Sequence, residues 1–416
     1  MLEDIFLSRR WIERFREAPL GPYVDAYADE LMALGYVRPG VRQAVSAASR
    51  FGRWLRKHHL QLGDVSEAII AKFRGRRGDS RSRHGEALLC GLLQHLRRVG
   101  VAPEPTRSDP TPLDRLDREF STYLAQERGL APVTIQNYSA VTRQFILHRF
   151  GSGVIDLSAL SVRDIRAFVS SHVGSRTAQP NRGTLTALRG LLTFLYVNGR
   201  ISARLADHVP IPPCWRNDSP PKWMSVDDVN LVLTCCDRQS PIGKRNYAIL
   251  MMLARLGLRA GEITSLTLDD IRWESGEIAV CGKGKNRKRF PLTEDVGEAL
   301  AIYLKDGRPP CGSRRVFLCS RAPWRALGDS SAIYGIVSRA LDLAGLSPPC
   351  RGPHIFRHSL ATMMMRQGAS LSEIGQILHH QNPNTTAIYA KVDIAGLRTI
   401  AMPWPGEDHG TTATRT

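Results

Sequence analysis

The sequence predicts a mainly helical protein with one small β-sheet, an α+β fold spread over several domains. The chain has 416 residues, and single hydrophobic cores rarely grow beyond roughly 250–300 residues. Apolar residues recur at helical spacing, as at Leu188, Leu191, Leu192 and Leu195. A pattern typical of strands lies around 277–292, where two short runs flank a glycine-rich turn. These observations favour helical bundles beside one mixed domain.

Two proline-rich segments divide the chain. They cover residues 102–112 and 210–221, and proline favours extended linkers because it fixes φ and lacks a backbone N–H. We therefore expect three units and a tail. The units are 1–101, 113–209 and 222–402, and the flexible tail is 403–416.

The first two units resemble copies of one plan. The stripe Leu89, Leu92, Leu93 and Leu96 before Gly100 matches Leu188, Leu191, Leu192 and Leu195 before Gly199 at a fixed offset of 99. Each unit is predicted to be a bundle of about four helices joined by short loops. Two unrelated bundles with similar stripes remain the alternative.

The third unit mixes helices and strands. Ser225, followed by two aspartates, predicts a helix start. The apolar run 247–256 predicts a helix that Gly257 closes. Residues 277–280 and 289–292 are expected to form a β-hairpin around the basic turn 282–286, and helices are expected from Pro353 through Tyr389.

Charge indicates a polyanionic partner. Lys and Arg number 57 against 39 Asp and Glu, a net charge of +18, and such a field attracts nucleic acid. No apolar run approaches the roughly 20 residues of a membrane span, and the first 16 residues lack the pattern of a signal peptide. A soluble, intracellular protein is expected. The eight cysteines lack zinc-site spacing and are expected to be reduced and buried.

Two basic residues of the third unit are candidates for holding a phosphate. Arg259 follows Gly257 on a turn, and a guanidinium can meet two phosphate oxygens at once. Glu262, three residues later, is placed to orient that arginine. Lys283 lies in the hairpin turn as a mobile cation that can reach a DNA groove.

Further candidates lie near the end of the same unit. His354 and Arg357 share one helical face because they are three residues apart. His380 precedes Tyr389 by nine residues. Together with Arg259 and Lys283, these groups suit attack of a tyrosine hydroxyl on a phosphodiester. Two guanidiniums would stabilise the charged phosphorane, and a Lys or His would protonate the leaving 5′-oxygen.

In this pattern the third unit resembles the catalytic domain of the tyrosine recombinase (phage integrase) family. The family pattern is an Arg in a G-L-R-x-x-E turn, a Lys in a G-K-G hairpin, H-x-x-R, then L-G-H and a Tyr nine residues later. It matches Arg259 with Glu262, Lys283, His354 with Arg357, His380 and Tyr389, and covers about 222–402. Residues 127–138 resemble the helical core-binding domain. His379 stands where the family usually has Gly, and the unit 1–101 is an addition to minimal members.

The resemblance implies a fold and an activity. It implies SAM-like helical core-binding domains before an integrase-type catalytic domain, with 1–101 as an extra helical DNA-binding unit. It implies a site-specific recombinase, integrase or transposase of a mobile element that breaks and rejoins DNA through a 3′-phosphotyrosyl link at Tyr389. Double-stranded DNA would be the partner, in a homotetramer or similar assembly on synapsed DNA, near the nucleoid of a bacterial cytoplasm. No metal, ATP or other cofactor is expected.

Two other functions remain open at this stage. One is a DNA-binding regulator that retains the fold without catalysis, which loss of Tyr389, Arg259 or Arg357 would favour. The other is a topoisomerase that uses the same phosphotyrosine chemistry. His358 and His379 are interpreted as packing or phosphate-contact residues, because no carboxylate or Cys completes a metal site with them.

Overall fold

The computed structural model describes nine stretches of the chain. They are 2–6, 8–75, 83–105, 109–151, 153–171, 182–211, 220–282, 287–380 and 382–392. The backbone divides into two compact units, one formed by 1–103 and 217–416 and the other by 104–216. Three main hydrophobic clusters lie within 2–102, 116–209 and 224–356. The three-domain division of the sequence stays a prediction.

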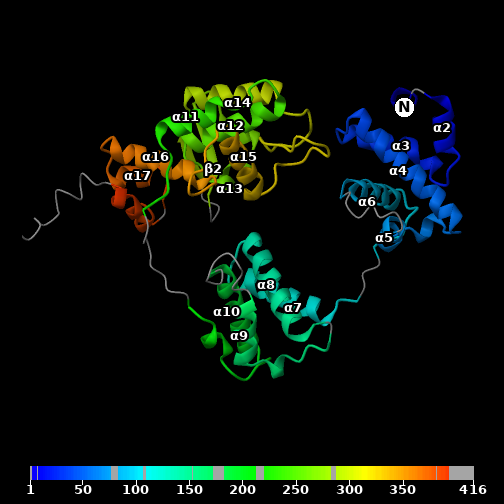
Figure 1. The fold of residues 1–416 in the computed structure, drawn as a ribbon, viewed down its shortest axis with the longest axis horizontal. Helices are drawn as coiled ribbons and strands as arrows, with labels where there is room; N and C mark the ends of the chain where they lie inside the picture. The colour runs from blue at the N-terminus through cyan, green and yellow to red at the C-terminus, as the bar shows by residue number, and fades with distance from the viewer. Residues whose placement is uncertain are drawn as a thin grey trace, which may run out of the picture. The chain divides into compact units, whose positions relative to one another are not determined.

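The N-terminal part is helical throughout its described residues (Figure 1). Pro39 lies in the first turn of the longest helix, where its missing N–H costs nothing. Phe51 and Leu55 of that helix are fully buried in the local cluster. The elements are α1 (Leu2–Ile5), α2 (Arg9–Arg16), α3 (Gly21–Ala33), α4 (Arg38–Lys57), η1 (Leu62–Asp64), α5 (Glu67–Gly75) and α6 (Arg83–Arg98).

Residues 104–216 form a second helical bundle. Thr111 caps its first helix by accepting a hydrogen bond from the Asp114 N–H, and the Asp114 carboxylate accepts one from the Thr111 N–H. Phe120, Phe145 and Phe168 are fully buried between its helices. The elements are α7 (Pro112–Gln126), α8 (Pro132–Phe150), η2 (Leu157–Ala159), α9 (Val162–Ser171), α10 (Arg182–Val197) and η3 (Leu205–His208).

These two bundles repeat one order of elements, as the sequence predicts. The order α3, α4, η1, α5, α6 returns as α7, α8, η2, α9, α10, and α6 and α10 have equivalent bounds 99 residues apart. Gly100 and Gly199, which follow the last helix of each series, both have positive φ, 75° and 65°. This left-handed conformation favours glycine at a helix end.

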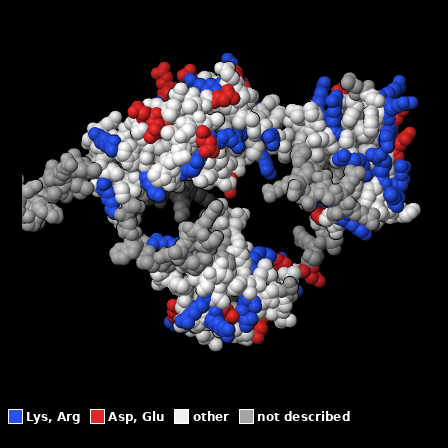
Figure 2. Space-filling model, in the orientation of Figure 1, with Lys and Arg blue, Asp and Glu red and all other residues white. Residues whose placement is uncertain are grey.

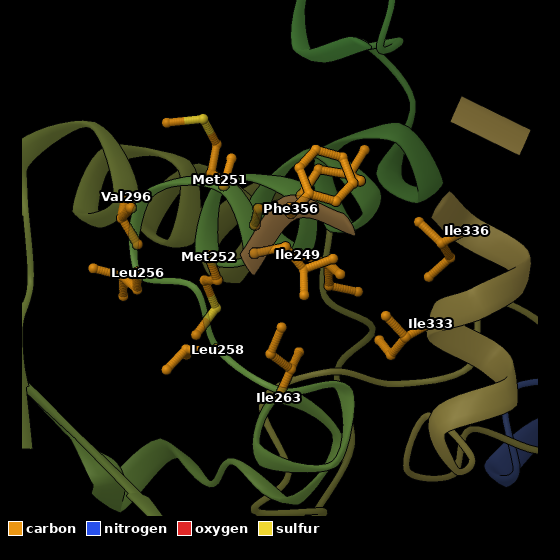
Figure 3. Packing of buried hydrophobic residues seen from close by; sticks show 14 of the residues in the cluster. Ile249, Met251, Met252, Leu256, Leu258, Ile263, Val296, Ile333, Ile336 and Phe356 are labelled. Atoms are coloured by element: carbon orange, nitrogen blue, oxygen red, sulfur yellow. The ribbon is translucent and has the colours of Figure 1, made fainter. Parts of the chain in front are cut away.

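The C-terminal part holds the largest hydrophobic cluster. Figure 3 shows Ile249 and Met252 of α12, Ile263 of α13, Ile333 of α15 and Phe356 of α16 converging on it. The helices are α11 (Val226–Thr234), α12 (Pro241–Arg255), α13 (Ala260–Ser265), α14 (Glu294–Asp306), α15 (Ser330–Leu343), α16 (His354–Arg366) and α17 (Leu371–Ile377). The described residues of this part also form 3-10 helices: η4 (Leu268–Asp270) before the first strand, and η5 (Pro383–Thr385) and η6 (Ala387–Val392) after α17.

A three-stranded antiparallel sheet lies in this part. Its order is β1 (Ile271–Arg272), β2 (Glu277–Cys281), β3 (Arg287–Pro291). Ile278 pairs with Phe290, and both side chains are buried. The hairpin prediction is confirmed, although β3 begins two residues earlier than predicted and β1 was not predicted.

Other expectations meet the structure with mixed results. The helix after Ser225 is confirmed, with Ser225 and Asp228 forming a capping box. Tyr389 lies on the short helix expected near the end of this unit, which is a 3-10 helix over Ala387–Val392. The expected burial of the cysteines is wrong for those described: Cys235 and Cys281 are exposed and five others are half-buried. Among the described helices, none has the length and apolar character to cross a bilayer. The tail 403–416 lies outside the described residues.

Candidate active site

The turn between α12 and α13 presents Arg259. Gly257 ends α12 with φ of 59°, and Arg259 is the extended N-cap residue of α13. The carboxylate of Glu262, which is 4% exposed, accepts from the Arg259 backbone N–H at 2.8 Å and from its Nη1 at 3.0 Å. The predicted orienting role of Glu262 has this geometric basis: one carboxylate fixes both the turn and the guanidinium.

Arg357 is buried on α16, with 4% of its surface exposed. Its Nη1 donates to the Gly257 carbonyl and its Nη2 to the Leu378 carbonyl, each at 2.5 Å. Burial, and then the charge of Arg259, lowers the pKa of Arg357 to about 10, so the guanidinium stays charged at neutral pH. A guanidinium has five N–H donors, and these two contacts leave others free for an anion.

Tyr389 is buried in η6, with 1% of its surface exposed. Its hydroxyl lies 2.9 Å from Nδ1 of His358. Burial raises the pKa of Tyr389 to about 12, while the charges of Arg357 and Arg259 act in the opposite direction. The phenol is therefore protonated at neutral pH and lies in the field of both arginines.

The two predicted histidines lie in the same electrostatic neighbourhood. Nδ1 of His380 is 2.7 Å from Oγ1 of Thr386, and its ring is parallel to the Tyr389 ring with centroids 6.5 Å apart. Burial first, then Arg357 and Arg259, lowers the pKa of His380 to about 4. Desolvation and the same two arginines lower the pKa of His354, the first residue of α16.

Lys283 lies outside the described residues. The nearest described lysine of the hairpin, Lys288 on β3, donates from Nζ to the His379 carbonyl at 2.5 Å. Burial and the charges of Arg259 and Arg357 lower its pKa. Lys288 lines a cavity of about 740 Å³ together with His379, His380 and Thr386.

The structure thus brings together five of the predicted residues with Glu262. Arg259 and Arg357 both act electrostatically on the pKa values of His354, His380 and Tyr389, which places the five residues in one site. Lys288 and the contact of His358 with Tyr389 were not predicted from the sequence. Two local features pointed to them: Lys288 belongs to the basic run after Gly282, and His358 directly follows Arg357.

A cluster of two arginines with neutral groups and a single carboxylate is suited to an anion. The Glu262 carboxylate is already bound to Arg259. Among the described residues, no group of three His, Cys, Asp or Glu side chains is placed to hold a metal ion. The site can bind a phosphodiester through guanidinium N–H groups and set a phenol hydroxyl beside it.

Similarity to known proteins agrees with this chemistry. The phage integrase family model matches residues 222–395. The protein y4rA of Sinorhizobium fredii, named as an integrase/recombinase, is 40% identical over 95% of this chain and 97% of its own length. Tyrosine recombinase XerD of Mycobacterium tuberculosis is 30% identical over 69% of this chain and 95% of its own length.

Solved structures share the fold. The site-specific recombinase XerH, in a post-cleavage complex with its difH substrate, matches with a TM-score of 0.52 and 19% identity, over 68% of this chain and 83% of that one. The Tn1549 transposon integrase in complex with a circular intermediate DNA matches with a TM-score of 0.50 and 17% identity, over 68% and 99%. The extended identity to y4rA and XerD shows that the chain belongs to the tyrosine recombinase (phage integrase) family of enzymes that cleave and rejoin DNA.

Proposed function

We propose that this enzyme is the site-specific recombinase or integrase of a mobile element and that Tyr389 is its nucleophile. The observation that carries the proposal is the placement of the Tyr389 hydroxyl in the field of Arg259 and Arg357, the two guanidiniums of a site rich in donors. A buried phenol close to two guanidiniums and a single carboxylate is typical of a functional site rather than of a packed core.

The free donors of Arg357 and Arg259 would hold the two non-bridging oxygens of one phosphodiester. Arg357 is fixed by its two carbonyl contacts and Arg259 by Glu262, so both donors are in place before DNA arrives. Such preorganised donors stabilise the extra charge of the pentacoordinate transition state.

In the reaction, the Tyr389 oxygen would bond to phosphorus while the bond from phosphorus to the 5′-oxygen breaks. Lys283 or His354 would protonate the leaving oxygen, and His380 and Lys288 would contact the phosphate. The product is a 3′-phosphotyrosyl link. Attack by the 5′-hydroxyl of another strand reverses the step and exchanges strands. The phosphoester bond is conserved throughout, so the proposed mechanism uses neither ATP nor a metal ion.

Double-stranded DNA is the proposed partner. Exposed arginines lie along α2 and α4, among them Arg9, Arg14, Arg50 and Arg56. Figure 2 shows basic side chains gathered on this part of the molecule. The described relatives XerH and Tn1549 integrase were solved with DNA. We assign 1–101 and 113–209 to DNA binding and 222–402 to catalysis, in a tetramer on two synapsed sites near the bacterial nucleoid.

Covalent capture on DNA tests the proposal. A duplex carrying the DNA end next to the gene, nicked just downstream of the scissile phosphate so that the short fragment with the new 5′-hydroxyl diffuses away, should trap the enzyme as an SDS-resistant adduct in the presence of EDTA. Adducts that need Mg²⁺ would contradict the metal-free mechanism. Relaxation of supercoiled plasmid without such a site would indicate a topoisomerase, and binding without any adduct would indicate a regulator.

A further inference from the structure

His358 makes the one side-chain hydrogen bond to the Tyr389 hydroxyl that the described part of the chain provides, with 2.9 Å between Nδ1 and Oη. It lies on α16, directly after Arg357, whereas Tyr389 lies on η6. The two ring centroids are 5.8 Å apart. The contact joins the reacting atom of the proposed mechanism to a group that can take up a proton.

The other histidines near Tyr389 are placed differently. Nδ1 of His380 is engaged by the Thr386 hydroxyl, and its ring is parallel to the phenol with the centroids 6.5 Å apart. His379 directs Nε2 to the Arg289 carbonyl at 3.1 Å. Neither has a hydrogen bond to Oη among the described residues.

The surroundings of His358 keep its imidazole neutral. Burial, and then electrostatic interaction with His354 and Arg357 on its own helix, lowers the pKa of His358, and His380 interacts with it from the segment after α17. A neutral imidazole has one nitrogen with a free lone pair. When the imidazole carries its one proton on Nε2, Nδ1 has the free lone pair and can accept the hydrogen of the Tyr389 hydroxyl across this contact.

Resting on the proposed function, we infer that His358 is a catalytic residue that accepts the proton of the Tyr389 hydroxyl as this oxygen attacks phosphorus. The O–H bond breaks and its proton passes to Nδ1, so that His358 becomes an imidazolium. The new O–P bond replaces the bond from phosphorus to the 5′-oxygen, which takes its proton from a different group. In the rejoining step the tyrosine oxygen leaves phosphorus and recovers the proton from His358, so that the full cycle consumes no proton.

DNA itself would switch this base on. A bound phosphodiester brings a negative charge next to Arg259, Arg357 and His354, and this charge offsets the positive field that holds the imidazole neutral. The proton affinity of His358 therefore rises when substrate occupies the site. The hydroxyl is activated in the complex and stays an ordinary phenol without DNA.

Two substitutions separate a base from a structural hydrogen bond. His358→Asn places an amide near the position of Nδ1, which can hydrogen-bond the hydroxyl but cannot accept a proton, whereas His358→Ala removes both. Single-turnover adduct formation on the nicked duplex should fall by about 10²-fold or more in both variants, with DNA affinity retained. A rate for His358→Asn within threefold of wild type would overturn the inference.

The acidity of the tyrosine gives a second test. The rate of adduct formation would not depend on it in this way if His358 only positioned the hydroxyl. Replacing Tyr389 by a fluorinated tyrosine of lower pKa in the His358→Asn background should restore much of the rate, because a more acidic phenol needs no base. The log of the rate of His358→Asn should also rise with pH up to pH 9 more steeply than that of wild type. Absence of both effects would overturn the inference. If wild-type enzyme forms no adduct while it binds the duplex, the proposed function fails instead.

Discussion

Tyr389 carries the most direct prediction at the scale of a single residue. Tyr389→Phe keeps the ring in its buried position and removes only the oxygen, so folding and DNA affinity should stay near wild type while covalent capture is lost. Gel analysis of SDS-resistant adducts and a binding titration measure the two properties. A wild-type level of adduct in this variant would show that the nucleophile lies elsewhere.

Arg357 should tolerate no replacement. Arg357→Lys keeps a charge, but one ammonium cannot bridge the Gly257 and Leu378 carbonyls and also hold a phosphate in the plane of a guanidinium. Cleavage should fall by at least about 10²-fold in Arg357→Lys and in Arg357→Ala. Arg314→Ala is the control, since Arg314 forms an exposed ion pair with Asp269. A loss below tenfold for both Arg357 variants would remove it from the proposed site.

His380 should make stability depend on pH. Its pKa is about 4 in the folded chain, below the usual 6.5, so between these values the unfolded chain binds a proton that the folded chain does not. This contribution is fully present above pH 6.5 and is lost as the pH falls toward 4. Thermal melts between pH 7.5 and 4.5 should show a smaller decrease for His380→Gln than for wild type. Parallel curves would contradict the lowered pKa.

How far the site could be predicted depended on the distance between partners along the chain. Arg259 and Glu262 are three residues apart, so helix geometry was enough to pair them. His358 and Tyr389 are 31 residues apart and belong to different elements, and nothing local indicates that α16 and η6 bring them together. Lys288 was missed because the register of β3 decides which hairpin lysine lies near the arginines.

At the scale of elements, the turn before α13 depends on Gly257. A Cβ at this position would lie 2.9 Å from Cδ2 of Leu378 and 3.0 Å from Cδ2 of Leu360, at φ of 59°. Gly257→Ala should cost about 1–2 kcal/mol for the left-handed backbone and should displace the carbonyl that holds Arg357. Both the melting temperature and the rate of adduct formation should fall.

Gly261→Ala is the matched control for this substitution. A Cβ at Gly261 meets no atom within 4 Å, and alanine favours the helix that contains it. Its melting temperature should equal or exceed that of wild type. If Gly257→Ala melted at the same temperature as Gly261→Ala, the turn would not need glycine.

The elements themselves were predicted to different degrees. The leucine stripe of α10 and the capping serine of α11 are local signals, and both helices follow from them. β1 has two residues and no periodicity, and it exists because Ile271 pairs with Ile278 of β2. Tyr389 lies on a 3-10 helix and packs in a cluster with Ala361 and Ile374, and a local sequence pattern does not distinguish such a short 3-10 helix from an α-helix.

For the whole molecule, the prediction concerns the N-terminal bundle. Residues 1–100 hold 18 Lys and Arg against 11 Asp and Glu, and phosphate contacts release counterions, so DNA affinity should fall steeply with salt. Deleting 1–101 should weaken binding and flatten the dependence of log affinity on log salt.

Fluorescence anisotropy of a labelled duplex at several salt concentrations measures this slope. The deleted part has its own hydrophobic cluster, so the remaining cores should persist, and circular dichroism of the shortened chain checks this. An unchanged slope would show that 1–101 does not touch DNA, and we would then assign it to contacts between subunits.

The burial of Tyr389 also bears on the safety of the cell. An enzyme that opens chromosomal strands is a hazard if its reactive oxygen meets every phosphodiester that diffuses past. With 1% of its surface exposed, the tyrosine proposed as the nucleophile offers almost no contact to nucleotides and other small phosphates in solution. On the proposed function, the free protein would therefore react little with such compounds before it binds its DNA site.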